Sequence, residues 1–150
     1  MATTAADPVF IDTNILVYAQ QAHSPFHAPA VARIQALAAA GQPLWISRQI
    51  LREYLSVMSR PGALTAPIPV ANLVADVRRF QRQFHTADEG APVTARLLTL
   101  LSATHCAGKQ VHDANVVATM LEHSVVHLLT HNVADFQRFA GYVTVIPLIP

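Results

Sequence analysis

The chain has 150 residues, of which 52% are hydrophobic and 13% are charged, and its net charge is +1 at neutral pH. These values are typical of one globular domain with a substantial core, and they exclude a disordered chain. They also argue against a protein that merely coats nucleic acid, since such proteins are far more basic.

Several simple features bear on where the protein works. No uninterrupted apolar run approaches the roughly 18 residues that a membrane helix needs. The first six residues lack the basic start and apolar stretch of a signal peptide, and the single cysteine, Cys106, cannot form an internal disulfide. We therefore expect one domain, residues 1–150, in the reducing cytoplasm and without a membrane anchor.

Strands and helices are predicted to alternate along the chain. The pattern indicates a buried strand at residues 8–12 and further strands within residues 43–47, 84–89, 125–130 and 142–148. Helices are predicted at residues 14–20, 24–41, 48–59, 70–84, 92–106 and 112–124, with a helical turn or two at 132–140. This order predicts an α/β fold with a mostly parallel central sheet of about five strands and helices on both faces.

Local signals mark two of the expected helix ends. Gly41 stands where a glycine commonly closes a helix, after the alanine-rich stretch 24–41. Ser47 is placed to cap the helix at residues 48–59. Cys106 falls inside the helix expected at 92–106, where we interpret it as a small buried residue.

The nine acidic residues are few enough to be considered singly. Five have ordinary interpretations, as a strand entry, a loop before a helix or the solvated face of a helix: Asp7, Asp88, Glu89, Asp76 and Glu122. Four are harder to explain in this way: Asp12, Glu53, Asp113 and Asp135.

Asp12 is the most unusual of these acids, because it ends an apolar strand. A buried carboxylate is costly unless another group pairs with it. It could cap the following helix, as could Asn14. In parallel sheets, however, ligands gather outside the carboxyl ends of the strands, where Asp12 lies.

The other three acids are ambiguous when taken alone. Glu53 lies at the border of the apolar stripe of its helix and could pair with Arg52 or Arg60. Asp113 starts an apolar helix, where the helix dipole favours an acid by about 0.3–1 kcal/mol. Asp135 follows a strand by a few residues, as an ordinary loop acid could.

Taken together, converging carboxylates indicate a metal site. Crowded like charges repel, so such a cluster persists only with a cation or with raised pKa values. Oxygen ligands with few imidazoles suit Mg²⁺ or Mn²⁺ rather than zinc. The eight histidines are scattered and show no HExxH spacing, so most are interpreted as surface or helix-end residues.

Four stretches, in order and spacing, resemble the motifs of PIN-domain ribonucleases: "FIDTNILVYA", "ISRQILREYLSVMSR", "VHDANVVATM" and "LLTHNVADF". A short domain of this kind is similar to the VapC-type toxins of bacterial type II toxin–antitoxin pairs. The resemblance implies a PIN-like three-layer sandwich and a Mg²⁺- or Mn²⁺-dependent endoribonuclease that hydrolyses RNA phosphodiester bonds.

The resemblance also implies roles for particular residues. Asp12, Glu53 and Asp113 would form a metal-binding acidic triad. Asp135 would be the fourth acid, and the site would hold one or two ions.

Three polar residues would support these acids: Asn14, Thr130 and Asn132. Many relatives carry an acid where this chain has Asn132. Either Asp135 alone supplies the fourth carboxylate, or this corner of the site is weaker and only one metal binds firmly.

The implied partners are an RNA substrate, a cognate antitoxin protein and a second copy of the chain. The apolar residues of the stretch 70–84 exceed what one small core covers, which is typical of a homodimer interface. Cationic residues that could contact RNA phosphates are Arg48, Arg52, Arg60 and Lys109, whereas Arg78, Arg79 and Arg82 fit a solvated helix face at least as well.

Two alternatives remain at this point. A haloacid dehalogenase-type phosphatase also places an aspartate after its first strand, but Asn14 occupies the position of the second aspartate that this class needs. A non-catalytic PIN-like module that binds RNA or protein is the other, and Asn132 leaves it open.

Overall fold

The computed structural model describes residues 6–62 and 66–150. Within these residues, five strands form one sheet in the order β3-β2-β1-β4-β5, and every neighbouring pair is parallel. The strands are β1 (Val9–Ile11), β2 (Leu44–Ser47), β3 (His85–Ala87), β4 (His127–Thr130) and β5 (Thr144–Pro147). The predicted α/β fold with a largely parallel sheet is confirmed.

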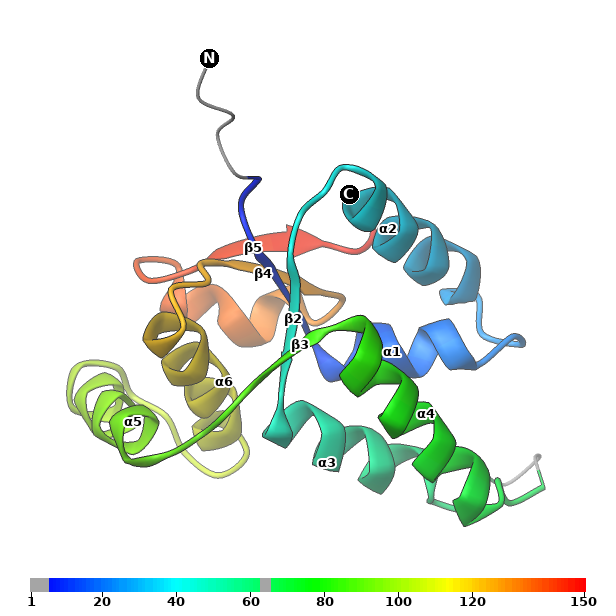
Figure 1. Ribbon diagram of the computed structural model, residues 1–150. Helices are drawn as coiled ribbons and strands as arrows, with labels where there is room; N and C mark the ends of the chain where they lie inside the picture. Colours follow the sequence, from blue (N-terminus) through cyan, green and yellow to red (C-terminus); the bar gives the residue numbers. More distant parts are fainter. Residues whose placement is uncertain (1–5, 63–65) are drawn as a thin grey trace.

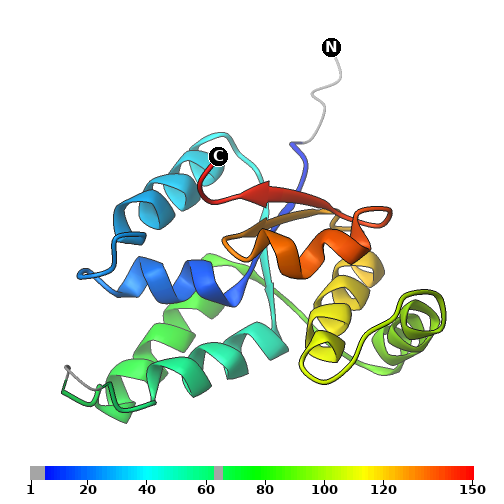
Figure 2. The same cartoon turned by 180° about the vertical axis from the view of Figure 1, so that it is seen from behind.

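Helices cover both faces of this sheet (Figures 1 and 2). On one side α1 packs against α2 and α3, and α3 packs against α4; on the other side α6 packs against α5 and η1. Their bounds are α1 (Thr13–Gln20), α2 (His27–Ala39), α3 (Arg48–Met58), α4 (Val70–Gln83), α5 (Ala91–Ala103), α6 (Gln110–Glu122) and the 3₁₀ helix η1 (Val133–Phe139). The molecule is therefore the three-layer sandwich that the sequence predicts.

The strand β1 lies at the centre of the sheet, and this position explains why all of its residues are apolar. All three of its residues are buried, since β2 flanks it on one side and β4 on the other. Strands covered on both faces are apolar throughout, unlike half-exposed strands. The chain runs from β1 outward to β3 and then returns to β4 on the opposite side of β1. The strand order thus reverses between β1 and β4, which makes their carboxyl ends the expected ligand site.

Both predicted helix-end signals are present in the structure. The hydroxyl of Ser47 accepts a hydrogen bond of 3.3 Å from the backbone N–H of Ile50 and so caps α3. Gly41 follows the end of α2 with a φ of +75°, in the left-handed region that glycine adopts most easily.

Two predicted helix boundaries are wrong by three residues. The helix expected at 24–41 begins only at His27. The helix expected at 92–106 ends at Ala103, because Thr104 is extended (φ −134°, ψ 123°). Cys106 therefore lies in the following loop, half-buried against the core, and not in a helix. Gly108, with a φ of +57°, completes the turn before α6 begins.

Across residues 6–62 and 66–150, no helix combines the length and apolarity needed to cross a membrane.

The left-handed backbone at Gly41 gives a stability prediction. An added Cβ at this position would meet no atom within 4 Å, so the cost of Gly41→Ala is that of the backbone conformation alone. We expect a loss of about 1 kcal/mol in the free energy of unfolding, and a melting temperature lower by about 2–4 °C. Gly141→Ala is the control, since Gly141 has equally open surroundings and no positive φ; an equal effect of both substitutions in thermal unfolding would contradict the prediction.

Candidate metal centre at the carboxyl edge of the sheet

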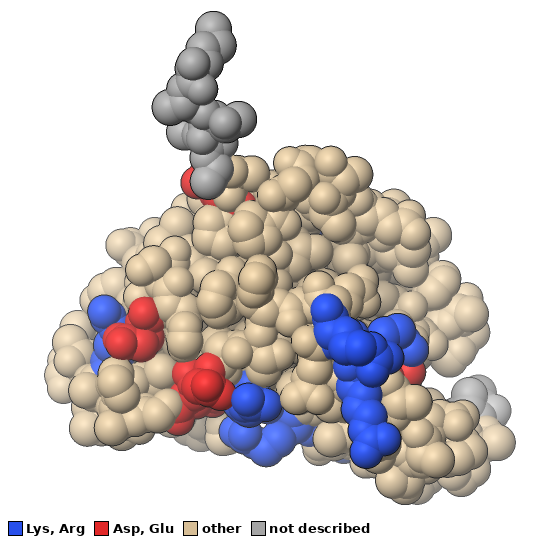
Figure 3. All heavy atoms as spheres, in the orientation of Figure 1, with Lys and Arg blue, Asp and Glu red and all other residues tan. Residues whose placement is uncertain are grey.

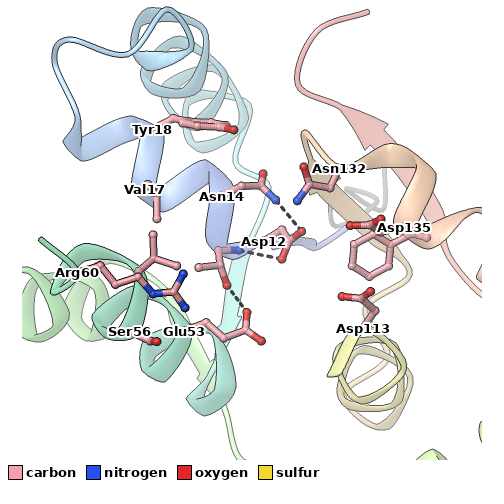
Figure 4. A pocket seen from close by; sticks show the side chains of 13 residues that line it. Asp12, Asn14, Val17, Tyr18, Glu53, Ser56, Arg60, Asp113, Asn132 and Asp135 are labelled. Atoms are coloured by element: carbon pink, nitrogen blue, oxygen red, sulfur yellow. Dashed lines mark hydrogen bonds between the residues drawn. The ribbon is translucent and has the colours of Figure 1, made fainter. Parts of the chain in front are cut away.

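A cavity of about 420 Å³ opens where the strand order reverses. Its walls include all four acids that the sequence singles out, Asp12, Glu53, Asp113 and Asp135 (Figure 4). These acids come from four different elements: the end of β1, α3, α6 and η1. The fold thus brings together side chains that are far apart in the sequence.

Asp12 connects β1 to α1 and is only 7% exposed. Its Oδ1 accepts a hydrogen bond of 2.9 Å from the backbone N–H of Thr13, at the start of α1. Its Oδ2 accepts from Asn14 Nδ2 at 2.9 Å and from the Thr130 hydroxyl at 2.7 Å. Asp12 is therefore both a helix cap and a wall of the cavity.

The charge of Asp12 is only partly compensated by these donors. Burial is the largest effect on its pKa and raises it, the hydrogen bonds lower it, and the charge of Glu53 raises it again. The result is a pKa raised from 3.8 to about 6. A nearby cation would favour the ionised form of this carboxyl.

The end of β4 is joined to α1 by the residues expected to support the acids. Thr130 Oγ1 accepts from Asn14 Nδ2 at 3.2 Å and from the backbone N–H of Asn132 at 3.0 Å. Asn14 Oδ1 in turn accepts from the backbone N–H of His131 at 2.9 Å. Asn132 directly precedes η1, whose first turn carries Asp135, so this junction places both residues at the cavity.

Glu53 projects from α3 and is held on both sides. The Thr13 hydroxyl donates to its Oε2 at 2.6 Å, and Gln49 Nε2 donates to its Oε1 at 2.8 Å. Within the described residues it makes no ion pair with Arg52 or Arg60, the pairing that was considered from sequence. Glu53 is thus an oriented cavity residue and not a solvated edge residue.

Asp113 lies in the first turn of α6, and its pKa is raised to about 6. Burial is the main cause, followed by the charges of Asp135, Asp12 and Glu53, while Lys109 lowers the pKa. The three neighbouring acids therefore act on one carboxyl electrostatically, and Lys109 is close enough to oppose them.

The basic residues are distributed unevenly around this cavity. Among the described residues that line it, Arg60 alone is basic. Arg48 pairs instead with Asp88 at 3.0 Å, and the nearest acid to Arg52 is Glu89 at 3.9 Å. Basic side chains also gather over α4 (Figure 3), the helix that carries Arg78, Arg79 and Arg82, and none of these three lines the cavity.

One acid with an ordinary expected role is placed differently by the structure. Asp76 is not on a solvated face: its carboxylate accepts a hydrogen bond of 2.6 Å from the buried hydroxyl of Tyr54 and pairs with Arg79 at 3.1 Å.

An aromatic group borders the cavity. Tyr18 is partly buried against the core and also lines the cavity. The ring of His131 lies 5.6 Å from that of Tyr18 and packs at 4.3 Å against Phe26.

A second group of polar residues lies beside the acids and was not predicted from the sequence. Gln49, Asn115 and Glu89 form hydrogen bonds with one another, and Gln49 reaches Glu53. The available signal was the spacing of Gln49, which stands one helical turn before Glu53 on the same face of α3. Nothing in the sequence pattern indicated Asn115 or Glu89, which was interpreted as an ordinary loop acid.

The acids suit a hard divalent cation by their chemistry. They offer carboxylate oxygens, the ligands that Mg²⁺ and Mn²⁺ prefer. Burial raises the pKa values of Asp12 and Asp113, and a bound cation would stabilise their ionised forms. In the described part of the chain, no three His, Cys, Asp or Glu side chains are already arranged around a metal position.

The fold is a parallel α/β sandwich in which four acids meet where the strand order reverses. These two features together define a class of α/β domain with an acidic site. Residues 9–142 match the PIN domain family. The chain belongs to this family, and the predicted resemblance is confirmed.

Individual relatives agree with the family assignment. The chain is 30% identical over 131 residues to Ribonuclease VapC24 of Mycobacterium tuberculosis, covering 86% of this chain and 89% of the relative. VapBC2 from Rickettsia felis, solved with a DNA fragment from their promoter, has a similar structure, with a TM-score of 0.67, 18% identity, and 93% and 97% of the two chains covered. A toxin–antitoxin complex from Klebsiella pneumoniae gives 0.59 and 21%, with 93% and 97% covered. At these identities the two structures establish a shared fold.

The crowding of acids predicts that removing one charge stabilises the metal-free protein. A carboxyl whose pKa is raised on folding contributes stability below its unfolded pKa, and this contribution is lost as the pH rises through about 6. The Asp113→Asn variant has no ionisable group at this position, so it does not lose this contribution to stability as the pH rises. In EDTA at pH 7.5 we expect its melting temperature to exceed that of the wild type by about 2–4 °C, which corresponds to about 1 kcal/mol after allowance for solvent screening of a half-buried group.

The difference should shrink as the pH falls to 4.5, where Asp113 is protonated in the folded wild type. Asp7→Asn serves as the control, because Asp7 is exposed. A melting temperature for Asp113→Asn below that of the wild type at pH 7.5 would show that repulsion among the acids is not significant.

Proposed function

We propose that the protein is a metal-dependent endoribonuclease that hydrolyses RNA phosphodiester bonds, as the toxin of a type II toxin–antitoxin pair. The observation that carries this proposal is the meeting of four carboxylates in one cavity of a PIN-family chain. The name of the relative, Ribonuclease VapC24, supports the same activity. Membership of the PIN family also replaces the haloacid dehalogenase alternative.

The residues that would hold the metal are Asp12, Glu53, Asp113 and Asp135, and the ion is Mg²⁺ or Mn²⁺, in one or two copies. When bound, such an ion supplies a water of lowered pKa as nucleophile and stabilises the charge that develops on the phosphate. Hydrogen bonds from Asn14 and Thr130 hold the Asp12 carboxylate in place for this role.

The remaining polar residues of the cavity would act on the substrate. Arg60 presents a cation at its wall and attracts an RNA phosphate toward the acids. Asn132 offers a neutral amide at the cavity, so Asp135 supplies the charge in that corner.

The proposed partners follow from the toxin assignment. Residues 1–150 act as a single cytoplasmic domain, which a cognate antitoxin protein binds and inhibits. A homodimer is supported by apolar side chains that remain exposed on and beside α4, namely Val70, Val74 and Ile68. Such residues commonly become buried between subunits.

A cleavage assay on a mixed RNA pool tests the activity. We expect cutting with Mg²⁺ or Mn²⁺, none with EDTA, and a loss in Asp12→Ala and Asp113→Asn that exceeds the roughly 10–100-fold cost of removing outer hydrogen-bond partners of a metal ligand. Circular dichroism checks that both variants are folded. If the wild type is folded but neither cuts RNA nor binds metal in a titration, this result would instead favour the non-catalytic PIN-like module.

The position of Arg60 gives a separate prediction. The Arg60→Gln substitution should remove one exposed contact to an RNA phosphate, worth about 1 kcal/mol. We expect KM to rise roughly fivefold, with little change in kcat. The slope of log KM against log salt concentration should fall by about one, because one fewer phosphate is neutralised. Arg82→Gln is the matched control, since Arg82 lies on α4 outside the cavity; equal effects of the two variants would place the RNA elsewhere.

A further inference from the structure

We propose that Gln49 is a positioning residue that holds the Glu53 carboxylate and the first turn of α6 at the spacing the metal site needs. The inference rests on the proposed function, and it assigns a role to a side chain that does not line the cavity. Gln49 is the second residue of α3 and is only 5% exposed.

The buried amide of Gln49 is almost fully hydrogen-bonded. Its Nε2 donates to Glu53 Oε1 at 2.8 Å and to the backbone carbonyl of His112 at 2.9 Å. Its Oε1 accepts from Asn115 Nδ2 at 2.8 Å. Three of the four hydrogen-bonding positions of the amide are thus used, which fixes the side chain in one orientation.

The chemistry of the partners determines which end of each amide is which. A carboxylate and a carbonyl only accept hydrogen bonds, so the end of Gln49 that faces Glu53 and His112 must be its nitrogen. By the same reasoning, Asn115 presents its nitrogen to Glu89 Oε1, at 3.1 Å, and to the oxygen of Gln49. Donors and acceptors therefore alternate without conflict from Glu89 to Glu53.

The hydrogen-bonded chain from Glu89 through Asn115 and Gln49 to Glu53 is called the relay below. Glu89 forms the end of the relay that lies farthest from the cavity. Its side chain is 11% exposed, and its Oε2 accepts the backbone N–H of Gln49 in the first turn of α3. A carboxylate at this position also interacts favourably with the helix dipole. The loop before α5 is thereby connected to the start of α3 and, through Asn115, to α6.

Two consequences follow for the acids of the cavity. Glu53 is held on Oε1 by Gln49 and on Oε2 by Thr13, and each oxygen keeps a lone pair for a cation. Asp113 directly follows His112, so the bond from Gln49 to the His112 carbonyl ties the turn that carries Asp113 to α3. One side chain thus relates the positions of two acids that come from different helices.

The test compares metal binding with stability. Gln49→Met keeps the length of the side chain and removes its hydrogen bonds, and Gln81→Met on the exposed face of α4 is the matched control. Titration with Mn²⁺ alone should show affinity weakened by about 10–100-fold in Gln49→Met and unchanged in Gln81→Met. In RNA cleavage, kcat should fall by a similar factor with KM within about twofold of the wild type.

A second variant checks that the relay acts as a unit. Asn115→Leu should weaken Mn²⁺ binding in the same direction, and the double variant with Gln49→Met should bind no worse than Gln49→Met alone. Such non-additivity is expected when one residue acts through another. Additive losses would overturn the relay. If Gln49→Met does not fold, Asn115→Leu and Gln49→Asn, which is shorter by one methylene, decide by the same titration.

The outcomes separate this inference from the function on which it rests. A folded Gln49→Met with a lower melting temperature and the Mn²⁺ affinity of the wild type would show a purely structural role and overturn the inference alone. Failure of the wild type itself to bind Mn²⁺, or equal binding by Asp113→Asn, would overturn the metal site and this inference together.

Discussion

The burial of one carboxylate at the centre of the sheet is the constraint on which the site depends. Asp12 ends a strand that is covered on both faces and is itself only 7% exposed, so water solvates its charge poorly. Three donors from α1 and β4 replace part of that solvation, yet the pKa of Asp12 stays raised, near 6. The same donors join β1, α1 and β4 at the point where the strand order reverses. The hydrogen bonds that compensate the buried charge of Asp12 therefore also fix the junction of β1, α1 and β4, where the other acids meet.

Stability and function oppose each other in this cavity. Each acid is placed by the structure around it: Asp12 caps α1, Glu53 accepts hydrogen bonds from Thr13 of α1 and Gln49 of α3, and Asp113 and Asp135 lie in the first turns of their helices. The fold thus brings the four carboxylates to one cavity although their charges repel. Positions that a simple stability argument would fill with neutral residues are therefore acidic, which is typical of sites built to receive a cation.

The features that the sequence predicts well are local ones. The apolar run before Asp12, the cap at Ser47 and the glycine at residue 41 each act through residues a few positions away, and the order of the motifs indicated the family. The missed features depend on long-range contacts. Gln49 meets Asn115 across 66 residues, and the periodicity of a helix gives the face of a side chain but not its partner. The end of α5 was predicted three residues too late, because the backbone becomes extended at Thr104 although no glycine or proline stands there.

The hydrogen bond between Thr130 and Asp12 spans 118 residues and joins strands that are neighbours at the centre of the sheet. The first strand to be synthesised therefore waits for one of the last before it is flanked on both sides. Contacts so distant in sequence form late in folding, since a long loop must close first. A ribosome that makes this chain must extrude it beyond residue 135 before all four acids can meet in the cavity, so a nascent chain that ends between residues 113 and 135 carries Asp12, Glu53 and Asp113 without the complete site.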